Sequence, residues 1–146
     1  MKLPDVNLLL YAYDSEAPRQ AAAREWLEET LSGAETVALA WAVMVGFLRI
    51  ATNRAIFERP WDAGDALDLV DSWLAQPAVT VVHPTDRHAA VLRDLLTPFG
   101  AAGNLTSDAH LAALAIEHGA TLYSSDNDFS RFPGLRWVDP LGERAR

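Results

Sequence analysis

Four aspartates fall where an acidic cation site is expected. Asp5 comes directly after the apolar run that opens the chain, and Asp126 and Asp128 follow a later short apolar run. Asp108 lies in the first turn of a segment with the pattern of a buried helix. Carboxylates that converge repel one another unless a hard cation lies among them, and Mg²⁺ binds carboxylates, water and substrate phosphate oxygens. The predicted chemistry is therefore metal-assisted displacement at phosphorus.

The alternative interpretation of each aspartate is a helix cap. Asp is favoured at N-caps and in first helical turns, because its carboxylate accepts backbone amides and complements the helix dipole. Asp108 is nevertheless the sole charged residue between Asp94 and Glu117, and Asn104 or Ser107 would suit capping better. The position of Asp108, together with the positions of the other three aspartates, favours a cation site over a helix cap.

The elements that must position these acids follow from the alternation of short strand-like runs with helical patterns. We expect strands at 1–4, 36–39, 79–82, 121–123 and 136–138. We expect helices at 7–13, 18–31, 42–52, 62–74, 85–97 and 105–118, and a short helical turn at 127–132. Such alternation predicts a parallel sheet covered by helices on both faces. Ligands of these sheets bind beyond the carboxyl ends of the strands, where Asp5 and Asp126 are expected.

Length and composition predict one domain over residues 1–146. The chain is 50% hydrophobic and 22% charged and has no Cys. The missing cysteines exclude disulfides, a thiolate nucleophile and cysteine-ligated metal centres. The longest uncharged apolar stretch, 37–48, has about twelve residues, whereas a membrane span needs roughly twenty. We therefore expect a cytoplasmic protein.

The charge balance is strongly acidic, with 20 acids against 12 bases, a net charge of −8 and a single lysine, Lys2. Bulk attraction to polyanions is therefore excluded, as are a phosphate-binding loop and Schiff-base chemistry, which need a lysine. Arg49, Arg54 and Arg59 form a local basic cluster. These arginines are either solvated residues at a helix end or a clamp for nucleic-acid phosphates.

Two other polar sets are interpreted as structural. An aspartate recurs along the helix expected at 62–74, opposite an apolar face, which predicts a solvated surface. The four histidines lack the spacing of a zinc site. His110 is the exception to follow, because it lies two residues after Asp108.

Four motifs in order carry a family resemblance. They are LPDVN at 3–7, GFLRIATN at 46–53, NLTSDAHLAALA at 104–115 and SDNDF at 125–129. Together they resemble a PIN-domain protein, specifically a VapC-type toxin ribonuclease, over nearly the whole chain. The resemblance implies a three-layer α/β/α sandwich with a mostly parallel central sheet. It also implies RNA cleavage that depends on Mg²⁺, with Mn²⁺ as a substitute.

The resemblance assigns the site residue by residue. Asp5, Asp108 and Asp126 match the catalytic, metal-binding acids of the family, and Asp128 matches a less regular additional metal ligand. We expect Asn7 and Ser125 to orient ligands or water. The implied partners are the RNA substrate, a cognate VapB-type antitoxin and a second copy of the chain in a homodimer.

One position departs from the family pattern. Many members carry a glutamate where this chain has Gly46, and there is no acid between Glu35 and Glu58. Three remaining carboxylates suit one metal better than two. One alternative function is therefore a catalytically weak PIN-like module that binds RNA or the antitoxin.

A second alternative is a magnesium-dependent enzyme of the aspartyl-phosphatase type, with Asp5 as phosphoryl acceptor. That chemistry needs a lysine near the phosphoryl group, and Lys2 precedes the site. The function we predict is an endoribonuclease toxin.

Overall fold

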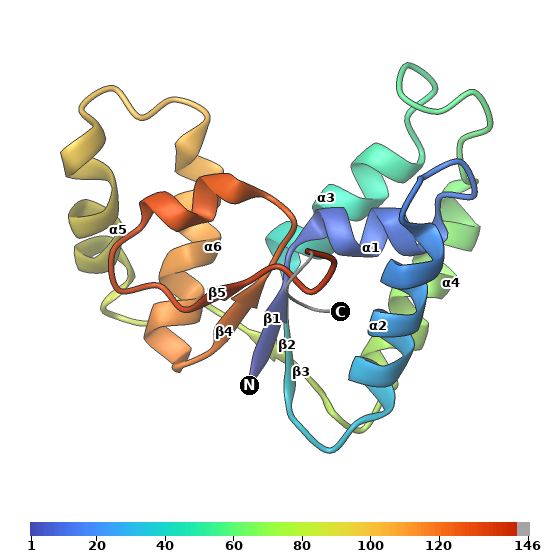
Figure 1. Cartoon of the computed structure of the whole chain (residues 1–146), viewed down its shortest axis with the longest axis horizontal. Coiled ribbons are helices and arrows are strands. Elements are labelled where there is room, and N and C mark those ends of the chain that lie inside the picture. Colours follow the sequence, from blue (N-terminus) through green and yellow to red (C-terminus); the bar gives the residue numbers. More distant parts are fainter. Residues whose placement is uncertain (143–146) are drawn as a thin grey trace.

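A computed structural model describes residues 1–142 and places helices on both sides of a five-stranded sheet (Figure 1). The strand order is β3-β2-β1-β4-β5, and all neighbouring pairs are parallel. The strands are β1 (Lys2–Pro4), β2 (Val37–Ala40), β3 (Val79–Val82), β4 (Thr121–Tyr123) and β5 (Trp137–Val138). The predicted three-layer α/β/α architecture is confirmed. Residues 143–146, the end of the domain predicted over 1–146, lie outside the described residues.

The helices divide into two groups (Figure 1). One side of the sheet carries α1 (Val6–Tyr13), α2 (Gln20–Ser32), α3 (Trp41–Ala51) and α4 (Ala63–Leu74). The other side carries α5 (His88–Leu96) and α6 (Leu105–His118). Two 3₁₀ turns, η1 (Thr97–Phe99) and η2 (Asn127–Arg131), complete the described chain. None of the helices within residues 1–142 has the length and apolar character needed to span a bilayer.

The helix expected from residue 85 begins later than predicted. Thr85 directs its backbone amide and its hydroxyl to the Glu117 carboxylate, at 2.9 and 2.6 Å, and its own carbonyl accepts the amide of His88. Residues 85–87 therefore form a turn tied to α6, and α5 starts only at His88. The start of this helix is set by a contact between residues distant in the sequence, which a local sequence pattern cannot show.

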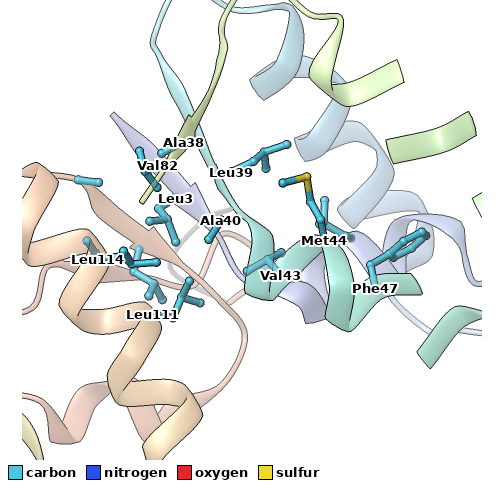
Figure 2. Packing of buried hydrophobic residues seen from close by; sticks show 14 of the residues in the cluster. Leu3, Ala38, Leu39, Ala40, Val43, Met44, Phe47, Val82, Leu111 and Leu114 are labelled. Carbon is cyan, nitrogen blue, oxygen red and sulfur yellow. The ribbon is translucent and has the colours of Figure 1, made fainter. Parts of the chain in front are cut away.

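The core lies on both faces of the two central strands. All four residues of β2 are buried, as expected for a parallel strand covered on both sides. Leu111 and Leu114 of α6 lie on the same side as Leu3, whereas Met44 and Phe47 of α3 lie on the other side (Figure 2). Residues 111–115 of α6 are all buried, which confirms the prediction of a helix sandwiched in the protein.

Aromatic side chains join α1, α3 and α4. The ring of Phe47 lies edge-on to Trp73, with centroids 4.9 Å apart, and Tyr13 contacts both rings and Trp61. The Trp73 indole N–H donates to the Tyr13 hydroxyl at 3.4 Å. This packing fixes α3, which forms one wall of the cleft described below.

The strand order creates a switch point between β1 and β4. From β1 the chain adds β2 and β3 on one side, and it then returns to add β4 and β5 on the other. Pro4 pairs with Tyr123, and the Asp5 amide extends the ladder by donating to the Tyr123 carbonyl at 2.8 Å. The residues that follow β1 and β4 are therefore neighbours at the carboxyl edge, where ligands of such sheets bind.

The aspartates of α4 behave as predicted for a solvated face. The Asp62 side chain caps the helix by accepting the Gly64 amide at 3.1 Å. The other three aspartates, Asp65, Asp68 and Asp71, are exposed on the helix.

Replacing Phe47 by Ala is expected to lower the free energy of unfolding by about 3–5 kcal/mol, since the change empties a buried ring site between Tyr13 and Trp73. Urea denaturation in chelator measures the change. Val45→Ala on the same helix is the control, because Val45 is 55% exposed and should shift stability by no more than about 0.5 kcal/mol. Equal effects of the two substitutions would contradict this packing.

Candidate metal centre

Asp5 occupies the first position after β1 and caps α1. Its Oδ1 accepts the amide of Val6 at 2.7 Å, and its Oδ2 accepts the hydroxyl of Ser124 at 2.8 Å. The carboxylate is therefore held by one bond from its own helix and one from the segment that follows β4. The cap interpretation is therefore confirmed for this residue, and its role as a metal ligand stays a prediction.

Asp126 caps η2 by accepting the amide of Asp128 at 2.9 Å. Its own amide donates to the Ser124 hydroxyl oxygen at 3.0 Å. Asp128 is half-exposed, with Arg131 3.9 Å away on the same turn. The turn after β4 thus projects two carboxylates from the edge of the sheet.

Asp108 reaches the same place from α6. The residue at the N-cap of this helix is Asn104, whose side chain makes no capping hydrogen bond, and Asp108 lies one turn further in. Ligand oxygens of Asp108, Asp126 and Asp128 lie within 4.8 Å of one another. Asp5 stands beside this group, linked to the Asp126 backbone through Ser124.

The electrostatics of the group are those of crowded, partly buried acids. Burial raises the pKa of Asp108 to about 6, and repulsion from Asp126, Asp5 and Asp128 adds to the rise. Burial also raises the pKa of Asp5, against the hydrogen bonds from Ser124 and Val6, and the charge of Asp126 adds to it. A bound cation would reverse these shifts, because it favours the charged form of each carboxylate.

The donor set fits a hard divalent cation. All the ligand atoms that converge are carboxylate oxygens, which Mg²⁺ and Mn²⁺ prefer over the softer sulfur ligands. The Oδ1 of Asn7 is buried and lacks a hydrogen-bond partner within residues 1–142. This carbonyl oxygen belongs to the side chain that donates to Ser124, so it is suited to accept from water in the inner shell of a cation.

Ser124 is the residue that sequence reasoning missed. It is fully buried, accepts from the Asn7 amide at 3.1 Å and the Asp126 amide, and donates to Asp5. We expected Ser125 in this role, but its hydroxyl faces Asp139 at 3.4 Å. Side chains alternate along an extended chain, so the inward position after Leu122 is 124 and not 125. That alternation is the signal from which Ser124 was predictable. Asn7 contacts Ser124, and its expected role in orienting ligands or water stays a prediction.

Asp5 and Asp108 open into a cleft of about 430 Å³ between α3 and α6. Asp5, Asp108 and His110 line one wall, and Gly46 and Arg49 line the wall formed by α3. Gly46 therefore lies in the cleft, as the family pattern for that position implies. The remaining lining from α3 is largely apolar.

The basic cluster is divided by the fold. Arg49 lies in the last turn of α3 and lines the cleft with the acids. Arg59 instead lines separate hollows beside Asp14 and Ser15, and Arg54 is exposed on the turn between them. A phosphate clamp at the acids therefore has one arginine in place, and the three-residue cluster is not a single site.

Comparison with known proteins agrees with this geometry. The PIN domain family model matches residues 2–135. Ribonuclease VapC37 of Mycobacterium tuberculosis is 45% identical over 140 residues, which cover 96% of this chain and 97% of that protein. Ribonuclease VapC33 of the same organism is 41% identical over 98% of this chain and its own full length.

Solved structures share the fold at low sequence identity. VapBC2 from Rickettsia felis, bound to a DNA fragment from its promoter, superposes with a TM-score of 0.68 at 19% identity, covering 94% of this chain and 96% of that one. Mycobacterium tuberculosis VapC20, described as a Sarcin-Ricin loop cleaving toxin, gives a TM-score of 0.65 at 19% identity, covering 93% and 99%. The chain belongs to the PIN domain family, among the VapC ribonucleases.

Replacing Asp108 by Asn is expected to stabilise the metal-free protein near neutral pH by about 1 kcal/mol. Because its pKa is raised to about 6, the stability that protonated Asp108 contributes is complete below its ordinary value of 3.8 and is lost as pH rises through about 6. The full shift corresponds to about 3 kcal/mol, reduced here because solvent screens a partly exposed carboxyl. Urea unfolding in chelator at about pH 4 and about pH 7 measures the gain.

The control for this experiment is Asp71→Asn on the exposed face of α4. It should change stability little at either pH. A gain for Asp108→Asn that is no larger at the higher pH would show that the pKa of Asp108 is not raised in the folded protein.

Proposed function

We propose that the protein is the toxin of a type II toxin–antitoxin pair and cleaves RNA by metal-assisted hydrolysis of a phosphodiester bond. Asp5, Asp108 and Asp126 would hold Mg²⁺, with Asp128 as an additional ligand and Mn²⁺ as a substitute. The observation that carries the proposal is the convergence of these acids at the switch point of a chain related to VapC ribonucleases along its whole length.

The residues of the chain divide the work between them. Ser124 holds the Asp5 carboxylate in place and ties it to the turn that carries Asp126. A bound Mg²⁺ supplies polarisation of a phosphate oxygen and a water of lowered pKa. Arg49, across the cleft, is placed to pair with an RNA phosphate. The acids exclude a phosphate from the cleft unless the cation is present, so metal binding and substrate binding are coupled.

The proposed partners follow from the same cleft. Its acids would accept a basic side chain from a VapB-type antitoxin, which would then block RNA. One structural neighbour, from Klebsiella pneumoniae, is described as a toxin–antitoxin complex. We further propose a homodimer and a cytoplasmic location, where RNA and antitoxin are both available.

The aspartyl-phosphatase alternative loses its main requirement in the structure. Lys2 lies at the amino end of β1, the opposite end from Asp5, and its ammonium is 3.7 Å from Glu35. A cation at that end of the strand cannot neutralise a phosphoryl group on Asp5. The non-catalytic binding module is the alternative that the next experiment separates from the nuclease.

Asp5→Asn is expected to lower RNA cleavage at least about a hundredfold, because it removes a charge from the metal-binding set. Cleavage of total RNA with Mg²⁺, with and without chelator, measures the loss, and circular dichroism tests the fold. Asp71→Asn is the control and should cut like the original protein. Cleavage that persists in excess chelator would refute the mechanism. Growth inhibition that persists in Asp5→Asn would favour the binding module.

Gly46→Glu is expected to strengthen Mn²⁺ binding roughly tenfold, since it adds a carboxylate to the wall facing the acids. There is room for it, because a Cβ at this position meets the Val6 side chain at an ordinary 3.5 Å. Isothermal titration calorimetry with Mn²⁺ measures the change. Gly46→Gln is the matched control without charge. Binding that is equal in the two variants would mean that position 46 does not reach the cation.

A further inference from the structure

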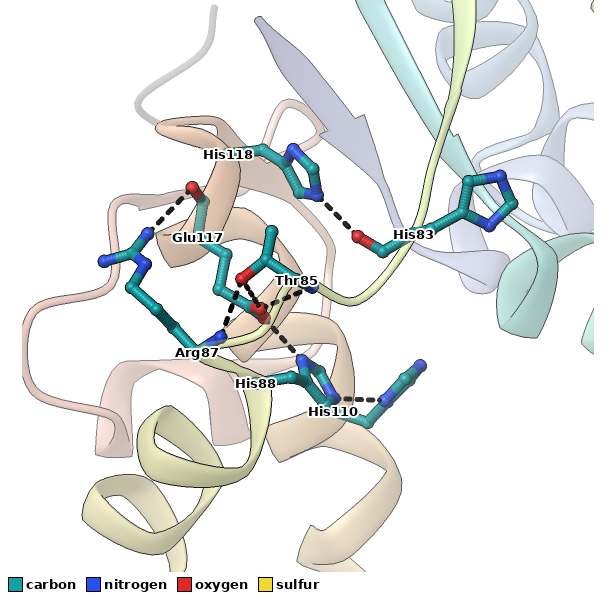
Figure 3. Close-up of polar contacts among 7 residues, drawn as sticks. All are labelled: His83, Thr85, Arg87, His88, His110, Glu117 and His118. Carbon is teal, nitrogen blue, oxygen red and sulfur yellow. Dashed lines mark hydrogen bonds and ion pairs between the residues drawn. The ribbon is translucent and has the colours of Figure 1, made fainter.

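Three side chains form a continuous row (Figure 3), and the last of them lines the cleft. The Glu117 carboxylate accepts a hydrogen bond from Nδ1 of His88, and Nε2 of His88 lies 2.9 Å from Nδ1 of His110. His88 comes from α5, whereas His110 and Glu117 lie two turns apart on α6. His110 lines the same cleft wall as Asp5 and Asp108. The row therefore connects the buried interface of α5 and α6 to the candidate metal centre.

The far end of the row is rigid. The Glu117 side chain is fully buried, and the His88 side chain is 13% exposed. The second oxygen of Glu117 accepts both the amide and the hydroxyl of Thr85. The pKa of Glu117 lies below its usual value because, against the effect of burial, these bonds and the bond from His88 favour the carboxylate. A carboxylate held by three donors has no freedom to rotate, so His88 is held with it.

This anchoring fixes the ring of His110. With Nδ1 bound to His88, the remaining ring nitrogen, Nε2, lies on the edge directed away from the His88–Glu117 pair (Figure 3). Within residues 1–142, Nε2 has no hydrogen-bond partner. An imidazole whose first nitrogen is held through a buried carboxylate has a defined orientation, and its second nitrogen is presented to whatever enters the site.

The surroundings indicate what that nitrogen meets. Asp108 lies two residues earlier on α6, and Arg49 faces it from α3 across a cleft of about 430 Å³. The carboxylates that converge within residues 1–142 are Asp108, Asp126 and Asp128, and His110 is not in that group. An RNA strand with a phosphate at those acids would bring ribose and phosphate oxygens past the adjoining turn of α6.

We infer that His110 binds RNA by accepting, at its Nε2, a hydrogen bond from a 2′-hydroxyl of the ribose backbone, and that His88 and Glu117 are its positioning residues. The inference rests on the proposed function, because that function places RNA in this cleft. It gives a role to a partly buried polar row between α5 and α6, two helices that pack against each other.

The first test measures RNA binding without cleavage, in the Asp5→Asn background. Fluorescence anisotropy with a labelled single-stranded RNA oligonucleotide of random sequence is the assay. Adding His110→Ala is expected to weaken binding about five- to tenfold, the worth of one hydrogen bond. Adding His83→Ala is the matched control. His83 is exposed, and its side chain points away from the row, so binding should not change (Figure 3).

The second test separates positioning from contact. His88→Ala and Glu117→Gln are each expected to weaken RNA binding by part of the loss seen with His110→Ala. Adding His88→Ala to His110→Ala should produce no further loss, because His88 acts only through His110. His110→Gln, which carries a polar group of similar reach, should recover part of the affinity and guards against a variant that merely fails to fold. Additive losses from His88 and His110 would overturn the positioning role.

A DNA oligonucleotide of random sequence tests the role of the ribose hydroxyl. Because DNA lacks the 2′-hydroxyl, His110→Ala should have no effect on DNA binding, and an equal loss on RNA and DNA would overturn this contact. Mn²⁺ titration completes the set, and Mn²⁺ affinity should be unchanged by His110→Ala. Unchanged RNA binding, or a loss of Mn²⁺ affinity equal to the loss of RNA affinity, would overturn the inference.

Cleavage assays keep this inference apart from the proposed function. In the cutting protein, His110→Ala should raise KM about five- to tenfold and change kcat little, since the contact is made before and after the chemical step. A protein that binds RNA through His110 but never cuts it would refute the nuclease proposal alone. A protein that cuts with unaltered KM in His110→Ala would refute this inference alone.

Discussion

Repulsion among the carboxylates at the carboxyl ends of β1 and β4 is the constraint on which the candidate metal centre depends. Asp108, Asp126 and Asp128 bring oxygens within 4.8 Å of one another, and the pKa of Asp108 rises to about 6 as a result of burial and of their charges. The fold maintains this arrangement through the buried Ser124, which joins the end of β1 to the turn after β4. We expect this arrangement to lower stability at neutral pH and, under the proposed function, to favour binding of a divalent cation.

The cation also resolves the conflict between an acidic protein and an anionic substrate. A net charge of −8 opposes non-specific binding of RNA, but several of these charges lie on the exposed face of α4, away from the cleft. Under the proposed function, a bound divalent cation and Arg49 would give the opposite local sign at the cleft. RNA affinity then depends on a few local contacts, which favours selectivity over general attraction to polyanions. The same acids suit an antitoxin that inserts a basic side chain.

Two packed units hold the walls of the cleft. Phe47, Trp73 and Tyr13 fix α3 from behind, and the apolar face of α6 seals it onto the sheet and α5. The Glu117–His88–His110 row crosses the second unit and reaches the cleft on the side of Asp108. Gly46 leaves space on the α3 wall of the cleft, at the position where the family resemblance leads us to expect an acid.

The sequence by itself determined the alternation of elements, the buried character of α6 and the identity of the acids, because apolar periodicity and polar residues after strands are local signals. It also determined membership of the PIN family through four ordered motifs. Tertiary structure alone decided which neighbours those residues acquire. Ser124, and not Ser125, bonds to Asp5, because the Ser125 hydroxyl faces Asp139. Helix α5 starts at His88 because Thr85 binds Glu117. Arg49 lines the cleft, whereas Arg59 lines a separate hollow. Each of these depends on contacts between residues distant in the chain, and the packing of helices against the sheet sets them.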